Sequence, residues 1–238
     1  MPVRDGLSWL LESVPSVLSE MEPNDEFVIV DDGSKNNITD FLPTDKRLKL
    51  IRLQPSGIVT ALNTGLNHCT GTYIARIDAD DIVIKGRASL QKNHLERNPH
   101  IAVLGGNAIL FSDDEHPGKG MLRYVDWVNG LTHLSAALFI ESPLFHPAVM
   151  MRTDVIKQVG GYREGDFPED YELWLRICSH GFQIDNLKHP IVRIRDHGNR
   201  LTRTDKRYSK KAFTHCKQMY CRVCGVSLHD VMKGNELS

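Results

Sequence analysis

One short segment constrains the fold of this chain more than any other. A mostly apolar run from Ile74 to Ile77 ends in the carboxylates of Asp78, Asp80 and Asp81. Such a run is typical of a buried strand, and in open α/β sheets ligands bind beyond the carboxyl ends of the strands. Side chains two residues apart on an extended backbone point the same way, and neighbouring carboxylates usually need a cation such as Mg²⁺ or Mn²⁺. The alternative is an acid that only caps the next helix.

The same pattern occurs earlier in the chain. Residues 27–30 predict a compact buried strand, and Asp31 and Asp32 follow it directly. Residues 48–53 and 73–77 predict two more strands, with a helix over 58–67 between them. Apolar side chains repeat at three- and four-residue intervals over residues 7–21, which predicts an amphipathic helix that Pro15 kinks or breaks. Strands and helices that alternate in this rhythm predict a parallel sheet with right-handed crossovers.

The second part of the chain is less regular. It predicts a helix over 87–97, a strand over 101–111, a mobile loop over 112–120, a loop and strand over 142–152 and a short helix over 154–159. Residues 168–178 predict a clearer helix, in which Pro168 suits the first position and Glu169 and Asp170 occupy the first turn. The sequence contains neither an internal repeat nor a linker that would mark a domain boundary, so we expect one domain over 1–238.

Composition excludes several classes of protein. The chain has 238 residues, of which 41% are apolar and 25% charged, and its formal net charge of −1 argues against nucleic-acid binding through bulk electrostatics. No apolar stretch approaches the roughly 18 residues that span a bilayer, and a charged-then-apolar leader is missing. We therefore expect a cytoplasmic protein, with peripheral attachment to the inner face of a membrane left open.

The cysteines do not indicate a disulfide framework, because their number is odd and the chain is long: Cys69, Cys178, Cys216, Cys221 and Cys224. A reducing compartment fits this pattern. The last three cysteines, with His215 and His229, are spaced roughly like zinc ligands, although Cys216 and Cys221 stand too far apart for a usual knuckle. Apolar residues at near-helical intervals over 211–232 favour buried cysteines on a helix, and zinc is the alternative.

Six ordered segments over residues 1–202 resemble the family 2 glycosyltransferases, an inverting group with the GT-A nucleotide-sugar fold. The segments are MPVRDG (1–6), VDDGS (30–34), Gly57 with ALNTG (61–65), DADD (78–81), EDYELW (169–174) and RDH (195–197). The resemblance implies an α/β, Rossmann-like and mostly parallel sheet flanked by helices. It further implies a nucleotide-binding half of about 1–105, an acceptor half of about 106–205 and a C-terminal helical tail of about 206–238.

The first strand of that fold is nearly missing from the sequence. Family members carry several apolar residues before the segment that matches Met1, Pro2 and Val3, and these residues form a central strand. The loss of a central strand would expose unpaired edges and apolar faces. We expect that the chain is truncated or its start misassigned; the alternative is a sheet built on a stub.

The resemblance also assigns roles on the donor side. Pro2 and Arg4 would lie beside the nucleotide, and Asp32 would accept a hydrogen bond from the base. Gly57 belongs to a nucleotide-contacting segment.

The metal ligands follow from the same comparison. Asp80 would hold a Mn²⁺ or Mg²⁺ ion on the diphosphate, and Asp78 would contact the ribose or the metal. His197 would complete the metal or diphosphate contacts.

On the acceptor side, the resemblance makes Asp170 the general base and places Glu169 and His146 near the acceptor. A carboxylate in the first turn of a helix is stabilised as the anion, so Asp170 would be a weak base unless burial raises its pKa. Without the other motifs, each of these residues has a structural explanation: acids favour first turns, and a lone histidine is usually packed.

Together these features predict an inverting enzyme of cell-envelope polysaccharide synthesis that moves a sugar from a nucleotide-sugar donor, expected to be a UDP-sugar, to a glycan or lipid-linked acceptor. One alternative is a non-catalytic nucleotide-sugar-binding subunit, which the short first strand and Arg200, where the family often has serine, favour slightly. A sugar nucleotidyltransferase would need a glycine-rich basic loop that residues 1–6 lack. The sequence leaves the oligomeric state open.

Basic residues are frequent over 193–211. We favour a solvated helix face for this stretch, and the alternative is a patch for an anionic acceptor such as a lipid-linked diphosphate at a membrane surface.

Overall fold

The computed structural model describes residues 1–113 and 116–228. Its first part is a parallel sheet with the order β1 (Pro2–Val3), β2 (Phe27–Asp31) and β3 (Leu48–Arg52). All of β2 is buried because helices cover both faces of this strand. Phe27 and Ile29 pack against α1 (Leu10–Leu18), whereas Val28 and Val30 pack against Ala61 of α2 (Ile58–His68). The alternation of side chains along β2 thus joins two helix layers to one strand.

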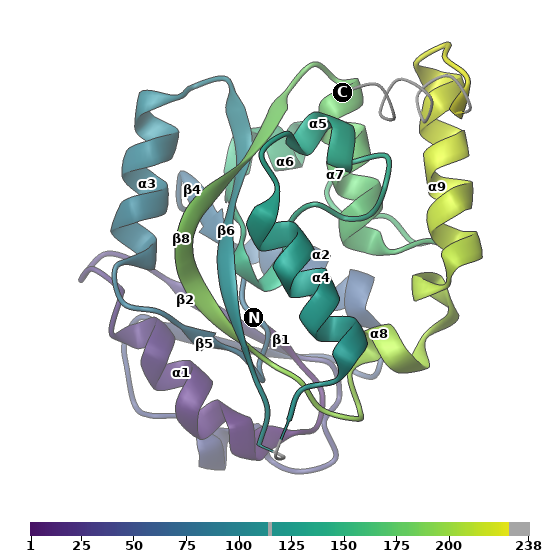
Figure 1. Cartoon of the computed structure of the whole chain (residues 1–238). Coiled ribbons are helices and arrows are strands. Elements are labelled where there is room, and N and C mark those ends of the chain that lie inside the picture. The colour runs from purple at the N-terminus through teal and green to yellow at the C-terminus, as the bar shows by residue number, and fades with distance from the viewer. Residues whose placement is uncertain (114–115, 229–238) are drawn as a thin grey trace.

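The second sheet is mixed and has the strand order β4-β7-β6-β8-β5. Its strands are β4 (Tyr73–Ala75), β5 (Ile82–Val83), β6 (Ile101–Phe111), β7 (Met150–Arg152) and β8 (Gln183–Arg195). The long strands β6 and β8 run side by side in parallel through the middle of the molecule (Figure 1). On either side lie α3 (Arg87–Arg97) and α4 (Lys119–Gly130), which pack on the sheet through Leu95 and through Val125 and Val128.

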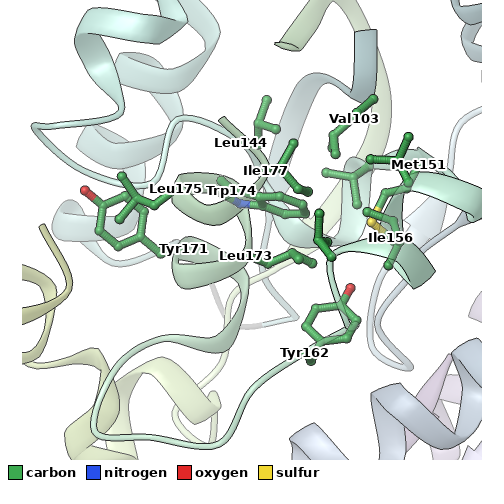
Figure 2. Packing of buried hydrophobic residues seen from close by; sticks show 14 of the residues in the cluster. Val103, Leu144, Met151, Ile156, Tyr162, Tyr171, Leu173, Trp174, Leu175 and Ile177 are labelled. Atoms are coloured by element: carbon green, nitrogen blue, oxygen red, sulfur yellow. The ribbon is translucent and has the colours of Figure 1, made fainter. Parts of the chain in front are cut away.

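The largest core cluster surrounds α7 (Glu169–Ser179). Trp174 is fully buried at its centre and faces side chains from the sheet, including Val103 and Met151 (Figure 2). On another side of α7, the ring of Tyr171 lies 5.1 Å from that of Phe213 on α9 (Lys210–Val223). Shorter helices complete the fold: α5 (Leu134–Ala137), α6 (Thr153–Gln158) and α8 (Leu201–Thr204). α7 therefore packs against both the mixed sheet and α9.

The predicted α/β class is confirmed, and the helix over 87–97 and the strand over 101–111 match residue for residue. One expectation was wrong: β4, the strand that precedes the acid cluster, does not join the parallel sheet. It pairs antiparallel with β7, with Ile74 opposite Met151. The chain leaves β4 through the acidic turn and reaches β5 and α3 without a helical crossover, so β4 can join the mixed sheet.

Other local differences have simple causes. The helix expected over 7–21 begins as a 3-10 turn at Leu7–Trp9, and α1 then continues through Pro15. The loop expected over 112–120 ends where α4 begins at Lys119, and residues 114–115 of it lie outside the described residues. Pro168 caps α7 and does not form its first helical residue, because its ψ of 126° is extended.

The cysteines remain thiols, since all five are free. Cys216 and Cys221 are buried on α9, as expected for core positions of a helix, and Cys224 is exposed. His229, the most distant of the zinc candidates, lies outside the described residues, and the other candidates form no metal-binding group among residues 1–113 and 116–228. Over these same residues, no helix combines the length and the apolar character that crossing a bilayer requires.

Candidate functional site

Three carboxylates gather directly after β4. Single oxygens of Asp78, Asp80 and Asp81 lie within 4.8 Å of one another. Asp81 is fully buried; its Oδ1 accepts a hydrogen bond from the Arg195 backbone N–H at 2.8 Å, and its Oδ2 has no partner among the described residues. Burial, reinforced by the charges of Asp80 and Asp78, raises the pKa of Asp81 well above its usual range. The cluster thus concentrates negative charge on closely spaced oxygens.

The end of β8 reaches the same cluster. His197 Nε2 lies 2.8 Å from Asp80 Oδ2, and Arg195 Nε donates to the Asp80 carbonyl at 2.9 Å. The centroid of the His197 ring also lies 4.3 Å from that of Trp9. Burial is the largest single influence and opposes ionisation of Asp80, but the hydrogen bond to His197 and the charges of Arg200 and His197 together outweigh it and lower the pKa of this carboxyl. The structure therefore brings together two predicted metal ligands that stand 117 positions apart.

The donor set of this cluster fits a hard divalent cation. Mg²⁺ and Mn²⁺ prefer carboxylate oxygens, and three of these are close enough here to share one ion. The buried Asp81 Oδ2 without a partner is a further sign that a positive group belongs nearby. The assignment of Asp78, Asp80 and His197 to a metal stays a prediction.

Asp32 follows β2 and organises the loop before α2. Its Oδ1 accepts from the Ser56 N–H at 2.6 Å and its Oδ2 from the Gly57 N–H at 3.0 Å, while Arg4 Nη1 lies 3.8 Å away. Gly57 has a φ of 91°, a conformation that favours glycine, and no atom lies within 4 Å of where a Cβ would stand. Pro2 is buried in β1. Arg4, Asp32 and Gly57 thus form one group beside open space.

The predicted acceptor residues form a second group. Glu169 is only 2% exposed, and Tyr208 donates to its two carboxylate oxygens at 3.0 and 2.8 Å. His146 Nδ1 lies 4.0 Å from Glu169 Oε1, and His146 Nε2 lies 2.9 Å from the Tyr162 hydroxyl. Burial lowers the pKa of His146 well below its usual range, so its imidazole is neutral. Glu169 consequently has no cationic histidine beside it.

Asp170 occupies the first turn of α7, as predicted, and its environment decides the question of its basicity. Burial, followed by the negative charge of Glu169, raises the pKa of Asp170 to about 7. The Tyr171 N–H, which donates to Asp170 Oδ1 at 2.7 Å, opposes this increase only in part. The expected helix-terminus effect is outweighed, and the carboxyl can exchange a proton near neutral pH.

Sequence reasoning missed Arg76, which contacts the acid cluster and acts on the acceptor-side group. Its Nη1 is 2.5 Å from Asp78 Oδ2, and its positive charge also acts on Glu169 and Asp170. The available signal was its position two residues before Asp78, which places both side chains on the same side of the strand. The contact of Tyr208 with Glu169 had no local signal, because it joins residues 39 positions apart.

These groups could carry out a transfer at a phosphate-linked centre. One side offers carboxylates for a cation and a diphosphate, and the other offers a carboxylate with a pKa near neutrality. Asp78 and Asp170 both act electrostatically on the Tyr162 hydroxyl, so the two groups share one neighbourhood.

Comparisons with known proteins identify the family and the fold. The model of the family described as "Glycosyl transferase family 2" matches residues 1–160. Over 176 residues the chain is 34% identical to the amylovoran biosynthesis glycosyltransferase AmsE of Erwinia amylovora, covering 72% of this chain and 64% of AmsE. It is 30% identical over 199 residues to the UDP-Gal:alpha-D-GlcNAc-diphosphoundecaprenol beta-1,3-galactosyltransferase of Escherichia coli, covering 81% of this chain and 70% of that protein.

A solved structure supports the fold. Residues 1–349 of S. aureus TarS in complex with UDP-GlcNAc superpose with a TM-score of 0.67 at 16% identity, covering 93% of this chain and 64% of that one. The likeness to TarS concerns the GT-A fold. The family model matches two thirds of this sequence, and two relatives are at least 30% identical to it. These comparisons establish the family of the chain. The chain belongs to glycosyl transferase family 2.

Proposed function

We propose that this protein transfers a sugar from a UDP-sugar to a lipid-linked acceptor with inversion at the sugar carbon and with the help of Mg²⁺ or Mn²⁺. One observation carries the proposal: Arg76 contacts the carboxylate cluster that is joined to His197, and its charge also acts on Asp170, an acid with a pKa of about 7. A single displacement needs a stabilised leaving group and a base on opposite faces of the same sugar carbon.

The nucleoside would bind beside Arg4, Asp32 and Gly57. Asp32 already accepts two backbone N–H groups, and the two oxygens of a carboxylate offer about four acceptor sites, which leaves room for a donor on the base. The half-exposed Arg4 can swing toward a phosphate. The names of two similar proteins support uridine: the E. coli relative uses UDP-Gal, and TarS was solved with UDP-GlcNAc.

The diphosphate would lie at Asp78 and Asp80, which would hold the cation with His197. The cation, when bound, acts as a Lewis acid on the leaving diphosphate. Asp80 stays ionised for this task, because the bond to His197 lowers its pKa. Asp81 is buried behind it and fixes the turn through the Arg195 N–H.

Asp170 would take the proton of the acceptor hydroxyl. Its raised pKa of about 7 brings its basicity closer to that of the developing oxygen nucleophile, while enough of it is ionised at neutral pH. Glu169, held by Tyr208, keeps that pKa high through its charge. His146 is neutral and supports Glu169 without neutralising it.

The acceptor is proposed from the relatives alone. The E. coli relative is named for a diphosphoundecaprenol-linked sugar. A lipid-linked diphosphate sugar offers the free hydroxyl that Asp170 requires.

The test combines binding and turnover. We expect Mn²⁺ to tighten UDP binding in calorimetry, and we expect the protein to release UDP from at least one of UDP-galactose, UDP-glucose and UDP-N-acetylglucosamine. Asp80→Asn should remove the effect of the metal on UDP affinity. Asp170→Asn should abolish turnover and leave UDP affinity nearly intact. Asp154→Asn is the matched control, because Asp154 stands in the first turn of α6 and also accepts the next backbone N–H.

Each outcome decides between explanations. An active Asp170→Asn variant would remove Asp170 as the base, and an unchanged metal response in Asp80→Asn would place the cation elsewhere. Tight, metal-dependent UDP binding without turnover of any donor or acceptor would make the protein a nucleotide-sugar-binding subunit.

A further inference from the structure

The guanidinium of Arg76 is buried with one of its donors unpaired. Arg76 is 7% exposed; its Nη1 forms an ion pair with Asp78 Oδ2, and its Nε has no hydrogen-bond partner among the described residues. Its neighbour Arg87 shows the usual arrangement: Arg87 is 3% exposed, and its Nε, Nη1 and Nη2 all donate, to Gln91 and to backbone carbonyls including that of Arg76. The two arginines share one environment but differ in their partners.

The ion pair with Asp78 balances the charge of Arg76 but leaves its Nε donor unpaired. Asp78 Oδ2 lies 2.5 Å from Nη1, so the positive charge is balanced, and the pKa of Arg76 is raised although burial opposes this. Nε takes no part in that contact and has no partner among the described residues. Buried N–H groups in folded proteins nearly always have a partner, so an unpaired one beside a binding site indicates a ligand acceptor.

The position of Arg76 shows which part of a ligand it would meet. Its charge acts on Asp78 on the donor side and on Glu169 and Asp170 on the acceptor side. In the displacement proposed above, the acceptor oxygen, which gives its proton to Asp170, attacks the sugar carbon from the face opposite the departing diphosphate. A group that contacts Asp78 and also acts on Asp170 therefore lies beside the sugar that is transferred.

We propose that Arg76 binds the transferred sugar, donating hydrogen bonds from its guanidinium N–H groups to hydroxyl or ring oxygens of the nucleotide-sugar and not to the diphosphate. The inference rests on the proposed function. Two hydrogen bonds fix the backbone of Arg76: its N–H donates to the Val149 carbonyl at 2.9 Å, and its carbonyl accepts from Arg87. A fixed backbone suits a residue that recognises the sugar.

The experiment measures how much the sugar adds to affinity. Dissociation constants for UDP and for UDP-galactose, UDP-glucose and UDP-N-acetylglucosamine are determined with Mn²⁺ for the wild-type protein, Arg76→Lys and Arg76→Met. Lysine keeps the charge beside Asp78 but lacks Nε and the planar fork. We expect Arg76→Lys to bind the preferred UDP-sugar about ten-fold more weakly, the effect of one hydrogen bond from a charged donor, with UDP affinity changed less than about two-fold. Arg76→Met, which also leaves Asp78 without its ion pair, should weaken binding of the UDP-sugar at least as much.

Arg152→Lys is the matched control. Arg152 lies on the neighbouring strand β7, and its Nε and Nη2 donate to the carbonyls of Ile101 and Leu95 at 2.8 and 2.6 Å, away from the acid cluster. This variant should lower the melting temperature and leave the ratio of UDP to UDP-sugar affinity unchanged.

The outcomes separate this inference from the proposed function. If wild-type protein neither binds UDP nor turns over any donor, the proposed function fails. If wild-type protein binds and turns over a UDP-sugar but Arg76→Lys keeps the full gain from the sugar, the assignment of Arg76 is overturned. An equal loss for UDP and UDP-sugar would place Arg76 on the diphosphate and would overturn it too.

Discussion

At the scale of single residues, Asp170 shows how environment decides chemistry. The first turn of a helix stabilises an anion by at most about 2 kcal/mol, whereas burial of a carboxylate can raise its pKa by several units. In this protein burial and the charge of Glu169 together raise the pKa of Asp170 to about 7. The same residue type in the first turn of α6, Asp154, is exposed.

This difference predicts a pH profile. Asp170 must be ionised to accept a proton, and its pKa lies above the usual range, so activity is lost as the pH falls through about 7. Glu169→Gln removes a neighbouring negative charge and therefore lowers the pKa of Asp170. The rising limb of kcat/KM against pH should move to lower pH in this variant. An unmoved limb in Glu169→Gln would mean that another group titrates, and Asp154→Asn should keep the wild-type profile.

Several site residues could be predicted from sequence because their positions follow simple local rules. Asp78 and Asp80 follow an apolar run, and Glu169 and Asp170 follow a proline that precedes a helix. Arg76 and Tyr208 were missed because their roles depend on contacts across the fold. The bond of Tyr208 to Glu169 spans 39 positions, and no periodicity encodes it.

At the scale of elements, α7 is fixed by a buried ion pair. Arg176 donates to both oxygens of Glu172 one turn earlier, at 2.9 and 2.7 Å, and to the Gly161 carbonyl at 2.7 Å. Tyr220 of α9 also donates to Glu172, at 2.5 Å. These bonds join α7 to the turn after α6 and to α9, and they hold Asp170 in place.

Removal of Glu172 would leave the charge of Arg176 buried without its partner. Glu172→Ala should therefore destabilise the protein by about 3–5 kcal/mol, measured by urea unfolding. Asp45→Ala, which breaks a partly exposed pair with Arg47 far from α7, should cost much less. Equal losses for the two variants would show that the network does not fix α7.

The elements that sequence reasoning missed have weak local patterns. β8 contains Pro190, which is unusual in a central strand, but Pro190 lies opposite Asn107 at an irregularity of the ladder, where the missing N–H is tolerated. α4 follows a stretch rich in glycine and proline that hides its first turn. Both elements are stabilised by packing on the mixed sheet, and propensity alone does not reveal that contact.

At the scale of the whole molecule, the two sheets meet at the acid cluster. Ala79, between Asp78 and Asp80, packs against the core of the parallel sheet, while β4 before it belongs to the mixed sheet. A ligand bound there should stabilise the native state as a whole. UDP with Mn²⁺ at a hundred times its dissociation constant should add about 2.7 kcal/mol and raise the melting temperature by about 5–10 °C. Asp80→Asn should remove most of that increase in the same thermal scan.

The basic stretch that follows β8 is less available than its composition indicates. Arg203 bonds to Asp196 at 2.7 Å, Arg207 to Asp205 at 2.7 Å, and Arg200 donates to the Arg195 carbonyl. These arginines hold the chain between β8 and α9 in place. The solvated helix face that we favour for this stretch stays a prediction.

The contact of Trp9 with His197 has a practical consequence, because the fluorescence of Trp9 can report on binding at the acid cluster. The sequence contains three tryptophans, and of these Trp174 is fully buried in the core, 5.9 Å from His146. Trp9 lies 4.3 Å from the ring of His197, whose partner is Asp80. Mn²⁺ bound there should quench the emission of Trp9. A titration of wild-type protein should then show saturable quenching that Trp9→Phe removes, which would give the affinity of the cation without substrate, label or turnover.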